Sequence, residues 1–268
     1  MKNTVLSTTP EIKQASELLE ELASKLTNVA SEFIKFQSPE EYRADVEALH
    51  LLQLTICHVE SVVSLAQQNL ALLPSAAVIS RSAFETAMNA LWMLEPEDPS
   101  QRQVRLIAFM QEEIDFYDRY IKKLNELGVD SANTLKIEQD RDKIKLFREA
   151  VIRNLPLEYK SLPKMPNIFD MLRSMNREVT YPFYRILCQY VHGTHAATWR
   201  YKTVLDNPNE IEEFLSPKKW HSLLHICGYS LEELGCKFLS RLGHDPELFL
   251  SESFRHEFWQ AIARIATS

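Results

Sequence analysis

The sequence is poor in glycine, with five glycines in 268 residues. Sheets and barrels need frequent turns, and turns rely on glycine, so this scarcity argues against β architecture and favours long helices. No apolar run reaches the ~18 unbroken residues of a membrane span, because Gln67–Asn69 and Pro74 interrupt the best candidate. The segment before Pro10 is too short and polar for a signal peptide. We therefore expect a cytoplasmic protein that makes no membrane contact.

Paired cysteines are also missing. Apolar helical patterns surround all four cysteines, and no CxxC motif occurs, which predicts buried free thiols in a reducing compartment. The four positions are Cys57, Cys188, Cys227 and Cys236.

An excess of positive charge is also missing, since 30 Lys and Arg stand against 37 Asp and Glu and the formal net charge is −7. Broad nonspecific nucleic-acid binding needs a positive surface, so this total argues against it but leaves room for a local basic groove. Arg200 lies between Trp199 and Tyr201, aromatic residues of the kind that stack on bases. Acidic residues are interleaved with the other basic clusters, which favours ordinary solvated charge. Those clusters are Lys122–Lys123, Lys143–Arg148 and Lys218–Lys219.

The chain has a recurring helix-start signal, in which Ser, Thr or Asp precedes Pro. Such a residue is a good N-cap, and proline at the first helical position loses no hydrogen bond. Together with helical hydrophobic periodicity, the signal predicts an all-α, bundle-like fold of about eight to nine helices and no sheet. We expect one domain over residues 1–268, with the proline-rich loop at 155–166 as its candidate subdivision. The predicted helices are Pro10–Phe36, Pro39–Leu72, Pro74–Leu94, Pro99–Leu127, Ser131–Arg153, Ile168–Met175, one from Pro182, Pro217–Leu242 and Pro246–Thr267.

The segment Thr180–Tyr201 carries the most unusual helical face. Arg185 and His192 are seven residues apart, so they share that face, two turns and about 10 Å of rise from each other. An arginine and histidines on an apolar helix are costly to bury unless they find partners. The full stripe is Tyr181, Arg185, Cys188, His192, His195 and Trp199.

A partner for this stripe lies upstream, in the predicted helix Pro74–Leu94. Arg81 and Glu85 are the only formal charges between Glu60 and Glu95, and they share the stripe of the large apolar residues. An exposed ion pair at this spacing contributes only ~0.2–0.5 kcal/mol, which does not explain its position on an apolar face. We therefore expect the two charge-poor helices to pack centrally. Their expected shared polar cluster consists of Arg81, Glu85, Arg185 and His192.

The spacing Arg185-x6-His192 resembles the Arg-x4–6-His pattern of the HEPN superfamily of helical ribonucleases. The resemblance implies that the histidine acts as general acid or base on the RNA 2′-hydroxyl and that the arginine stabilises the phosphate, without a metal or cofactor. The chain departs from the family at Ile186, where a polar residue is usual. A purely structural polar cluster is the alternative.

A second resemblance covers roughly the middle half of the chain. An Arg-Ser-x-x-Glu helix and a later Tyr-x-x-x-Cys-x-x-Val-His segment resemble an uncharacterised all-helical bacterial family, domain of unknown function 5677. The family implies an all-helical fold and a distant HEPN relation, without an established reaction. The matching residues are Arg81, Ser82, Glu85, Tyr184, Cys188, Val191 and His192.

Histidine pairs also allow metal sites to be considered. His192 and His195, with Glu85 from the other helix, would form a two-histidine-one-carboxylate set. His221 and His225 are spaced for zinc but lack a third ligand, and core or surface packing is favoured for them. A ferritin-like di-iron site needs Glu-x-x-His on two helices, which neither His192 nor His195 provides. We therefore predict no metal.

Two functional classes remain open. One is a HEPN-like, metal-independent ribonuclease of the toxin or defence type, with RNA as substrate and often a two-fold homodimer. The other is a non-catalytic helical module that binds a protein partner or a small ligand. The first needs His192 exposed in a cleft, whereas the second allows the polar cluster to be buried. The candidate catalytic residues are Arg185 and His192, supported by Arg81 and Glu85, and the candidate binding residues are Tyr184, His195, Trp199 and Arg200.

Overall fold

A computed structural model describes residues 6–35, 43–128, 131–156, 159, 163–194 and 216–267. These residues form helices joined by turns, with no strand among them, which confirms the all-α prediction. The α-helices are α1 (Pro10–Lys35), α2 (Arg43–Gln68), α3 (Leu73–Leu94), α4 (Pro99–Glu126), α5 (Ser131–Arg153), α6 (Ile168–Ser174), α7 (Tyr181–Val191), α10 (Lys218–Arg241), α11 (Pro246–Phe249) and α12 (Glu252–Thr267). Short 3-10 turns at Leu70–Leu72 and Glu178–Thr180 precede α3 and α7.

The predicted N-caps are present at three of these helix starts. Thr9 Oγ1 accepts the backbone N–H of Ile12 at 3.3 Å. Asp98 accepts the N–H of Ser100 at 2.9 Å, and Asp245 likewise caps α11. Each side chain satisfies a donor that the first helical turn leaves free. At α10, by contrast, Pro217 itself is the cap residue and no side chain caps the helix.

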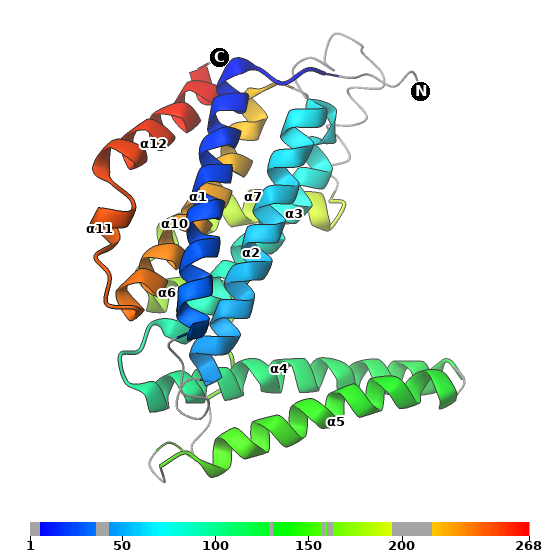
Figure 1. The fold of residues 1–268 in the computed structure, drawn as a ribbon. Helices are drawn as coiled ribbons and strands as arrows, with labels where there is room; N and C mark the ends of the chain where they lie inside the picture. The colour runs from blue at the N-terminus through cyan, green and yellow to red at the C-terminus, as the bar shows by residue number, and fades with distance from the viewer. Residues whose placement is uncertain are drawn as a thin grey trace.

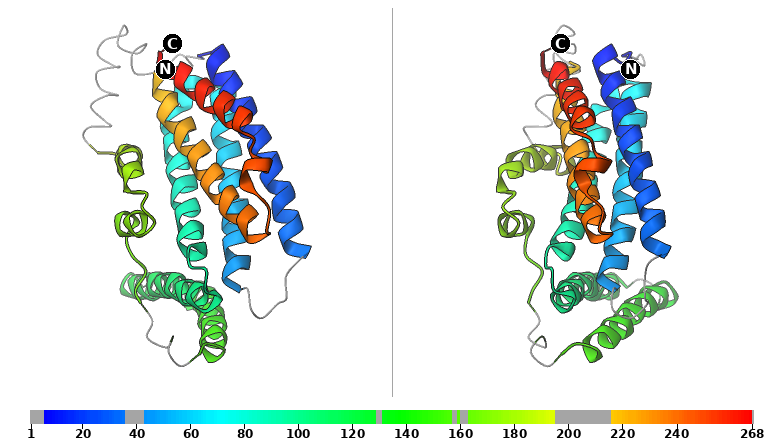
Figure 2. Two further views of the ribbon diagram at one scale, coloured as in Figure 1. Left: turned by 90° about the vertical axis from the view of Figure 1, so that its left-hand side faces the viewer. Right: turned by 60° about the vertical axis from the view of Figure 1, so that its left-hand side comes forward.

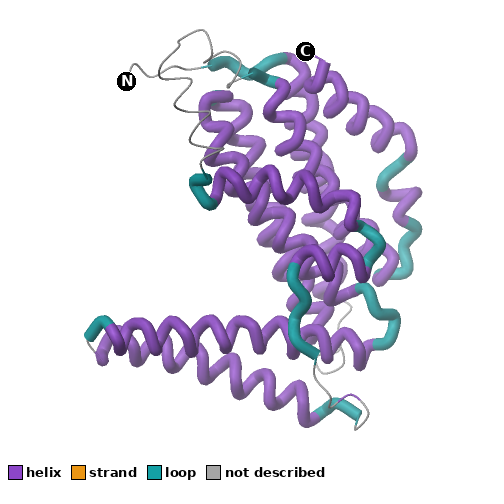
Figure 3. The backbone as a smooth tube through the Cα atoms, turned by 180° about the vertical axis from the view of Figure 1, so that it is seen from behind, coloured by secondary structure: helices purple, strands orange, loops and turns teal. Residues whose placement is uncertain are grey.

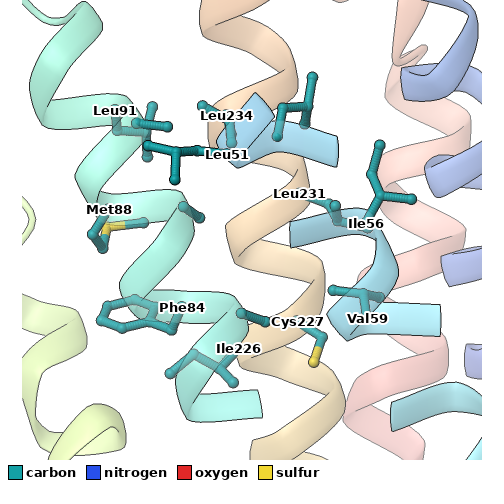
Figure 4. Packing of buried hydrophobic residues seen from close by; sticks show 14 of the residues in the cluster. Leu51, Ile56, Val59, Phe84, Met88, Leu91, Ile226, Cys227, Leu231 and Leu234 are labelled. Atoms are coloured by element: carbon teal, nitrogen blue, oxygen red, sulfur yellow. The ribbon is translucent and has the colours of Figure 1, made fainter. Parts of the chain in front are cut away.

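The body of the molecule is a bundle of long helices, α1, α2, α3, α10 and α12 (Figures 1 and 2). Helix α3 packs against both α2 and α10, and apolar side chains of all three meet in the core (Figure 4). Phe84 and Leu91 of α3 and Leu231 of α10 are fully buried there. The charge-poor character of α3 follows from this central position, because most of its circumference is covered by other helices.

Helix α2 is long and apolar enough to cross a membrane by length and composition. Half of its most apolar window is buried inside the bundle. A core helix passes the same test, so α2 is weak evidence for a span.

The structure corrects the prediction that all four cysteines are buried. Cys57 on α2 is exposed and Cys236 on α10 is half-buried, whereas Cys188 and Cys227 are buried.

Helices α4 and α5 form an antiparallel hairpin, called the arm below, that projects from one end of the bundle (Figures 1 and 3). Ile114 and Ile121 of α4 are buried. Arg141 of α5 pairs with Asp118 of α4 at 3.0 Å. This ion pair and the buried isoleucines hold the two helices of the arm together.

The structure corrects two further predictions. The last predicted helix is two helices, because Leu250 leaves the helical conformation and is buried. The next helix, α12, begins at Glu252, and the Ser251 hydroxyl accepts the backbone N–H of Phe254 in its first turn. Helix α7 is peripheral rather than central, since Arg185 and Ile186 on its outer side are exposed. The second central helix is α10, which contacts α1, α2, α3 and α12.

Candidate functional site

The polar cluster is built around the guanidinium of Arg81 on α3. Its Nε and Nη2 atoms lie 3.0 and 2.9 Å from Oε1 of Glu85, one helical turn along α3. The hydroxyl of Tyr184 on α7 donates to the same carboxylate oxygen at 2.7 Å. The guanidinium carbon also lies 5.5 Å from the centroid of the Tyr184 ring. The carboxylate of Glu85 therefore orients both the arginine and the tyrosine.

Helix α7 brings Tyr184 to this place because the tyrosine and Cys188 are on its buried side. The Tyr184 ring packs against Phe84 of α3 with centroids 5.8 Å apart. Aromatic pairs prefer such inclined arrangements, so the contact fixes the ring as well as burying it. The apolar packing positions the hydroxyl at Glu85.

His192 is the residue that ends α7. Its backbone N–H donates to the carbonyl of Cys188 at 3.1 Å, and Gly193 follows with φ of 52°, a left-handed conformation that favours glycine. The side chain of His192 is exposed, and its Nε2 lies 3.4 Å from Nη1 of Arg81. A guanidinium only donates hydrogen bonds, so Nε2 is the acceptor and Nδ1 carries the proton in this arrangement.

The electrostatics of the cluster favour a charged arginine and a protonated tyrosine. Burial opposes the charge of Arg81, but the adjacent Glu85 carboxylate outweighs burial and raises the pKa of Arg81. Burial, followed by the hydrogen bond and charge of Glu85, raises the pKa of Tyr184 far above its usual range. The site thus presents a permanently charged guanidinium whose Nη1 atom points at the exposed imidazole of His192.

The structure brings together three of the four residues of the expected cluster. Arg81, Glu85 and His192 meet, while Arg185 is exposed and makes no hydrogen bond or ion pair with the described residues. The face of α7 that meets α3 is centred on Tyr184 and Cys188, which places Arg185 away from the contact. The other candidate binding residues, His195, Trp199 and Arg200, lie outside the described residues.

The described residues contain no group of three metal-binding side chains. His225 of α10 instead stacks on Phe183 of α7, with centroids 5.3 Å apart, and packs at an inclined angle against Trp259 of α12, with centroids 4.9 Å apart. Burial, and then the charge of His221, lowers the pKa of His225. The two histidines therefore act as packing groups at the junction of three helices.

Two features had no clear sequence signal. One is the buried ion pair between Asp45 of α2 and Arg102 of α4, with Oδ1 and Nε 3.1 Å apart. The other is a cavity of about 280 Å³ where the arm meets α2, with Glu47 and Glu113 among its lining residues. Both join segments more than fifty residues apart in sequence, so periodicity within one helix does not reveal them.

Comparison with known proteins gives one result. Residues 46–211, more than half of the chain, match the model of a family described as a family of unknown function (DUF5677). No curated protein and no solved structure matches the chain. The matched region contains α3 and α7, and therefore the four residues called the Arg81 cluster below, which are Arg81, Glu85, Tyr184 and His192.

Proposed function

We propose that this chain, which belongs to the family of unknown function (DUF5677), binds an RNA phosphodiester at the Arg81–His192 pair and cleaves it without a metal ion. The observation that carries the proposal is that the His192 side chain is exposed although it lies 3.4 Å from a largely buried arginine. A purely structural histidine would be expected to be buried with its partner. An exposed imidazole next to a fixed cation suits a reaction on an anion.

The proposed reaction uses the groups of the pair in separate roles. His192 Nε2 takes the proton of the RNA 2′-hydroxyl, and the 2′-oxygen forms a new bond to the adjacent phosphorus. Arg81 stabilises the negative charge that develops on the phosphate oxygens. The bond from phosphorus to the 5′-oxygen breaks, and this oxygen takes a proton from solvent. The products are a 2′,3′-cyclic phosphate and a 5′-hydroxyl end.

Glu85 and Tyr184 are positioning residues in this proposal. Glu85 binds Nε and Nη2 of Arg81, so Nη1 is the donor that can reach the phosphate. In the proposal, the phosphate replaces His192 as the partner of Nη1, which frees His192 Nε2 to act as the base. Tyr184 holds the carboxylate of Glu85 and connects α3 to α7. Arg185 of α7, the phosphate-binding residue expected from the HEPN resemblance, is exposed. In the proposal, its guanidinium is a second positive charge that attracts the RNA strand. Free thiols fit a cytoplasmic effector of this type.

The test is an RNA-cleavage assay on purified parent, His192→Ala and Arg81→Lys proteins, with and without EDTA. We expect His192→Ala to lower cleavage ~10²–10⁴-fold, the usual contribution of a general base. Arg81→Lys keeps a positive charge but loses the planar, forked donor geometry, so cleavage should also fall. EDTA should leave the parent rate unchanged, because every proposed role belongs to a side chain.

A matched control is His50→Ala, which removes another exposed histidine, on α2. This variant should cleave RNA like the parent. The free energies of unfolding of parent, His192→Ala and His50→Ala, obtained from thermal melts, should agree within ~0.5 kcal/mol. A parent that cleaves no RNA from a set of varied sequences, together with a destabilised His192→Ala variant, would refute the ribonuclease.

The alternative is a non-catalytic module, in which the cluster only attaches α7 to α3. The short hydrogen bond from Tyr184 to Glu85 favours it, because this contact alone gives a structural reason for both residues. Such a module would bind a protein partner or a small ligand. Under this alternative, Glu85 variants lose stability while no RNA cleavage occurs in the parent.

A further inference from the structure

One face of α4 carries a regular series of large or charged side chains. Spacings of four and three residues alternate along it, so its members lie on one side of the helix. This series, called the α4 stripe, consists of Phe109, Glu113, Phe116, Tyr120, Lys123 and Leu127. It is distinct from the buried positions Ile114 and Ile121 and from the Arg81 cluster.

Three apolar members of the α4 stripe are exposed, and Phe109 is half-buried. Exposure is 55% for Phe116, 44% for Tyr120 and 67% for Leu127. Phe116 and Tyr120 stack on each other with centroids 6.1 Å apart, which forms a continuous aromatic surface. Both residues belong to the second half of α4, and α4 is a helix of the arm that projects from the bundle (Figure 1). Exposed apolar groups collected in this way mark interaction surfaces.

The chemistry of the stripe is symmetric about residue 118. Moving outward on either side, each half has an aromatic residue, then a charge, then an apolar residue. The charges have opposite signs, Glu113 on one side and Lys123 on the other. Such a pattern is self-complementary under a two-fold axis, where each residue of one copy meets its counterpart in the other. We propose that α4 is the interface of a homodimer, in which two copies pair antiparallel along this stripe.

In this dimer, Phe116 of each copy faces Tyr120 of the other. Glu113 faces Lys123 of the second copy, so two equivalent ion pairs flank the aromatic centre. Leu127 faces Phe109 of the second copy, at the edge of the cavity of about 280 Å³ between α4, α5 and α2. Apolar side chains, including Met110 of α4, line much of that cavity. It therefore offers a binding place for the exposed leucine at the arm tip.

The two charges of the stripe itself select the antiparallel direction. An antiparallel pair places Glu113 of one copy against Lys123 of the other, whereas a parallel pair in register opposes Glu113 to Glu113 and Lys123 to Lys123. Burial, and then the charge of Glu47, raises the pKa of Glu113. A cation from a second copy would stabilise the ionised carboxylate at this position.

The test is a charge swap measured by sedimentation equilibrium on the full chain. We expect the parent to dimerise, and Glu113→Lys and Lys123→Glu alone to weaken dimerisation at least tenfold, because each puts like charges opposite each other. The double variant Glu113→Lys/Lys123→Glu should recover the parent affinity, since it restores both ion pairs with reversed signs. Circular dichroism checks that each variant remains helical.

Glu60→Lys on α2 is the matched control, because it reverses an exposed charge away from the arm and should leave the dimer unchanged. A monomeric parent at high protein concentration overturns the interface. A dimer that both single reversals leave intact also overturns it, as does a double variant that stays as weak as the singles. The readout does not depend on RNA cleavage, so His192→Ala should dimerise like the parent even if the ribonuclease proposal fails.

Discussion

At the scale of single residues, the Arg81 cluster combines a fixed part and an open part. Glu85 and Tyr184 hold the guanidinium from one side, and only 16% of the Arg81 side chain is exposed. On the other side, His192 is exposed and its Nε2 lies within hydrogen-bonding distance of Nη1 of Arg81. Stability and chemistry should therefore depend on different members of the same cluster.

Glu85→Ala should destabilise the protein, because it leaves a largely buried guanidinium and a tyrosine hydroxyl without their shared acceptor. Glu85 is 36% exposed, so water replaces part of the lost interaction, and the expected cost is ~1–3 kcal/mol. Urea denaturation gives the free energy of unfolding.

The control for this prediction is Glu85→Gln, which keeps an acceptor oxygen for Tyr184 but removes the negative charge. It should cost less than Glu85→Ala. Equal stability of the parent and the alanine variant would mean that the cluster does not hold α7 on α3.

Sequence patterns predicted Arg81, Glu85 and His192 as neighbours because charges on an otherwise apolar helix need partners. They did not predict that Arg185 is exposed. With an apolar residue on most sides of Arg185, the buried side of α7 could not be identified from periodicity alone. Its packing against Phe84 of α3 decides which side is buried.

At the scale of helices, α10 depends on two glycines that allow close packing. A Cβ atom added to Gly228 would lie 2.2 Å from Cζ of Phe258 on α12, and one added to Gly235 would lie 2.4 Å from Cδ2 of Leu26 on α1. Both neighbouring side chains are buried. The glycines therefore let α12 and α1 approach α10 closely.

Gly228→Ala should destabilise the protein by ~1–3 kcal/mol, the usual cost of overpacking. In a helix without this contact, the same change stabilises by up to ~1 kcal/mol, so the sign of the effect reports the close packing. The measurement is the melting temperature of the variant beside that of Gly228→Ala/Phe258→Leu, whose smaller side chain should relieve the clash. A higher melting temperature for the single variant would contradict the prediction.

Helix boundaries were the most predictable part of the fold, since caps such as Asp98 and Asp245 act within a few residues of themselves. The break at Leu250 was not predictable in the same way. Its cause is burial of the leucine against other helices, a tertiary contact that overrides the helical periodicity of the segment.

At the scale of the whole molecule, one buried ion pair connects the arm to the bundle. Asp45 and Arg102 each have 3% of their side chain exposed. Arg102 Nη1 also donates to the carbonyls of Pro96 and Glu97 at 3.1 and 2.8 Å. The same arginine thus holds the start of α4 on α2 and satisfies the backbone of the α3–α4 turn.

Asp45→Leu should cost ~3–5 kcal/mol, because it leaves the buried Arg102 charge without a counter-ion. Asp45→Leu/Arg102→Met should cost less than this single change, since it removes the uncompensated charge as well. Urea denaturation of the parent, both singles and the double variant measures the coupling. A double variant whose cost equals the sum of the singles would show that the pair is not coupled.

The core of the bundle is complete only when α10, from late in the sequence, packs against α1, α2 and α3. The indole Nε1 of Trp220 on α10 donates to the carbonyl of Leu70, which lies 150 residues earlier. At a synthesis rate of ~5–20 residues per second, the inner faces of α2 and α3 wait ~8–30 s for α10 to leave the ribosome. The arm, whose helices are neighbours in sequence, can pair during that interval. In the nascent chain, the arm can therefore be complete before the core of the bundle is. The apolar faces of α2 and α3 that α10 later covers are accessible to chaperones during that time.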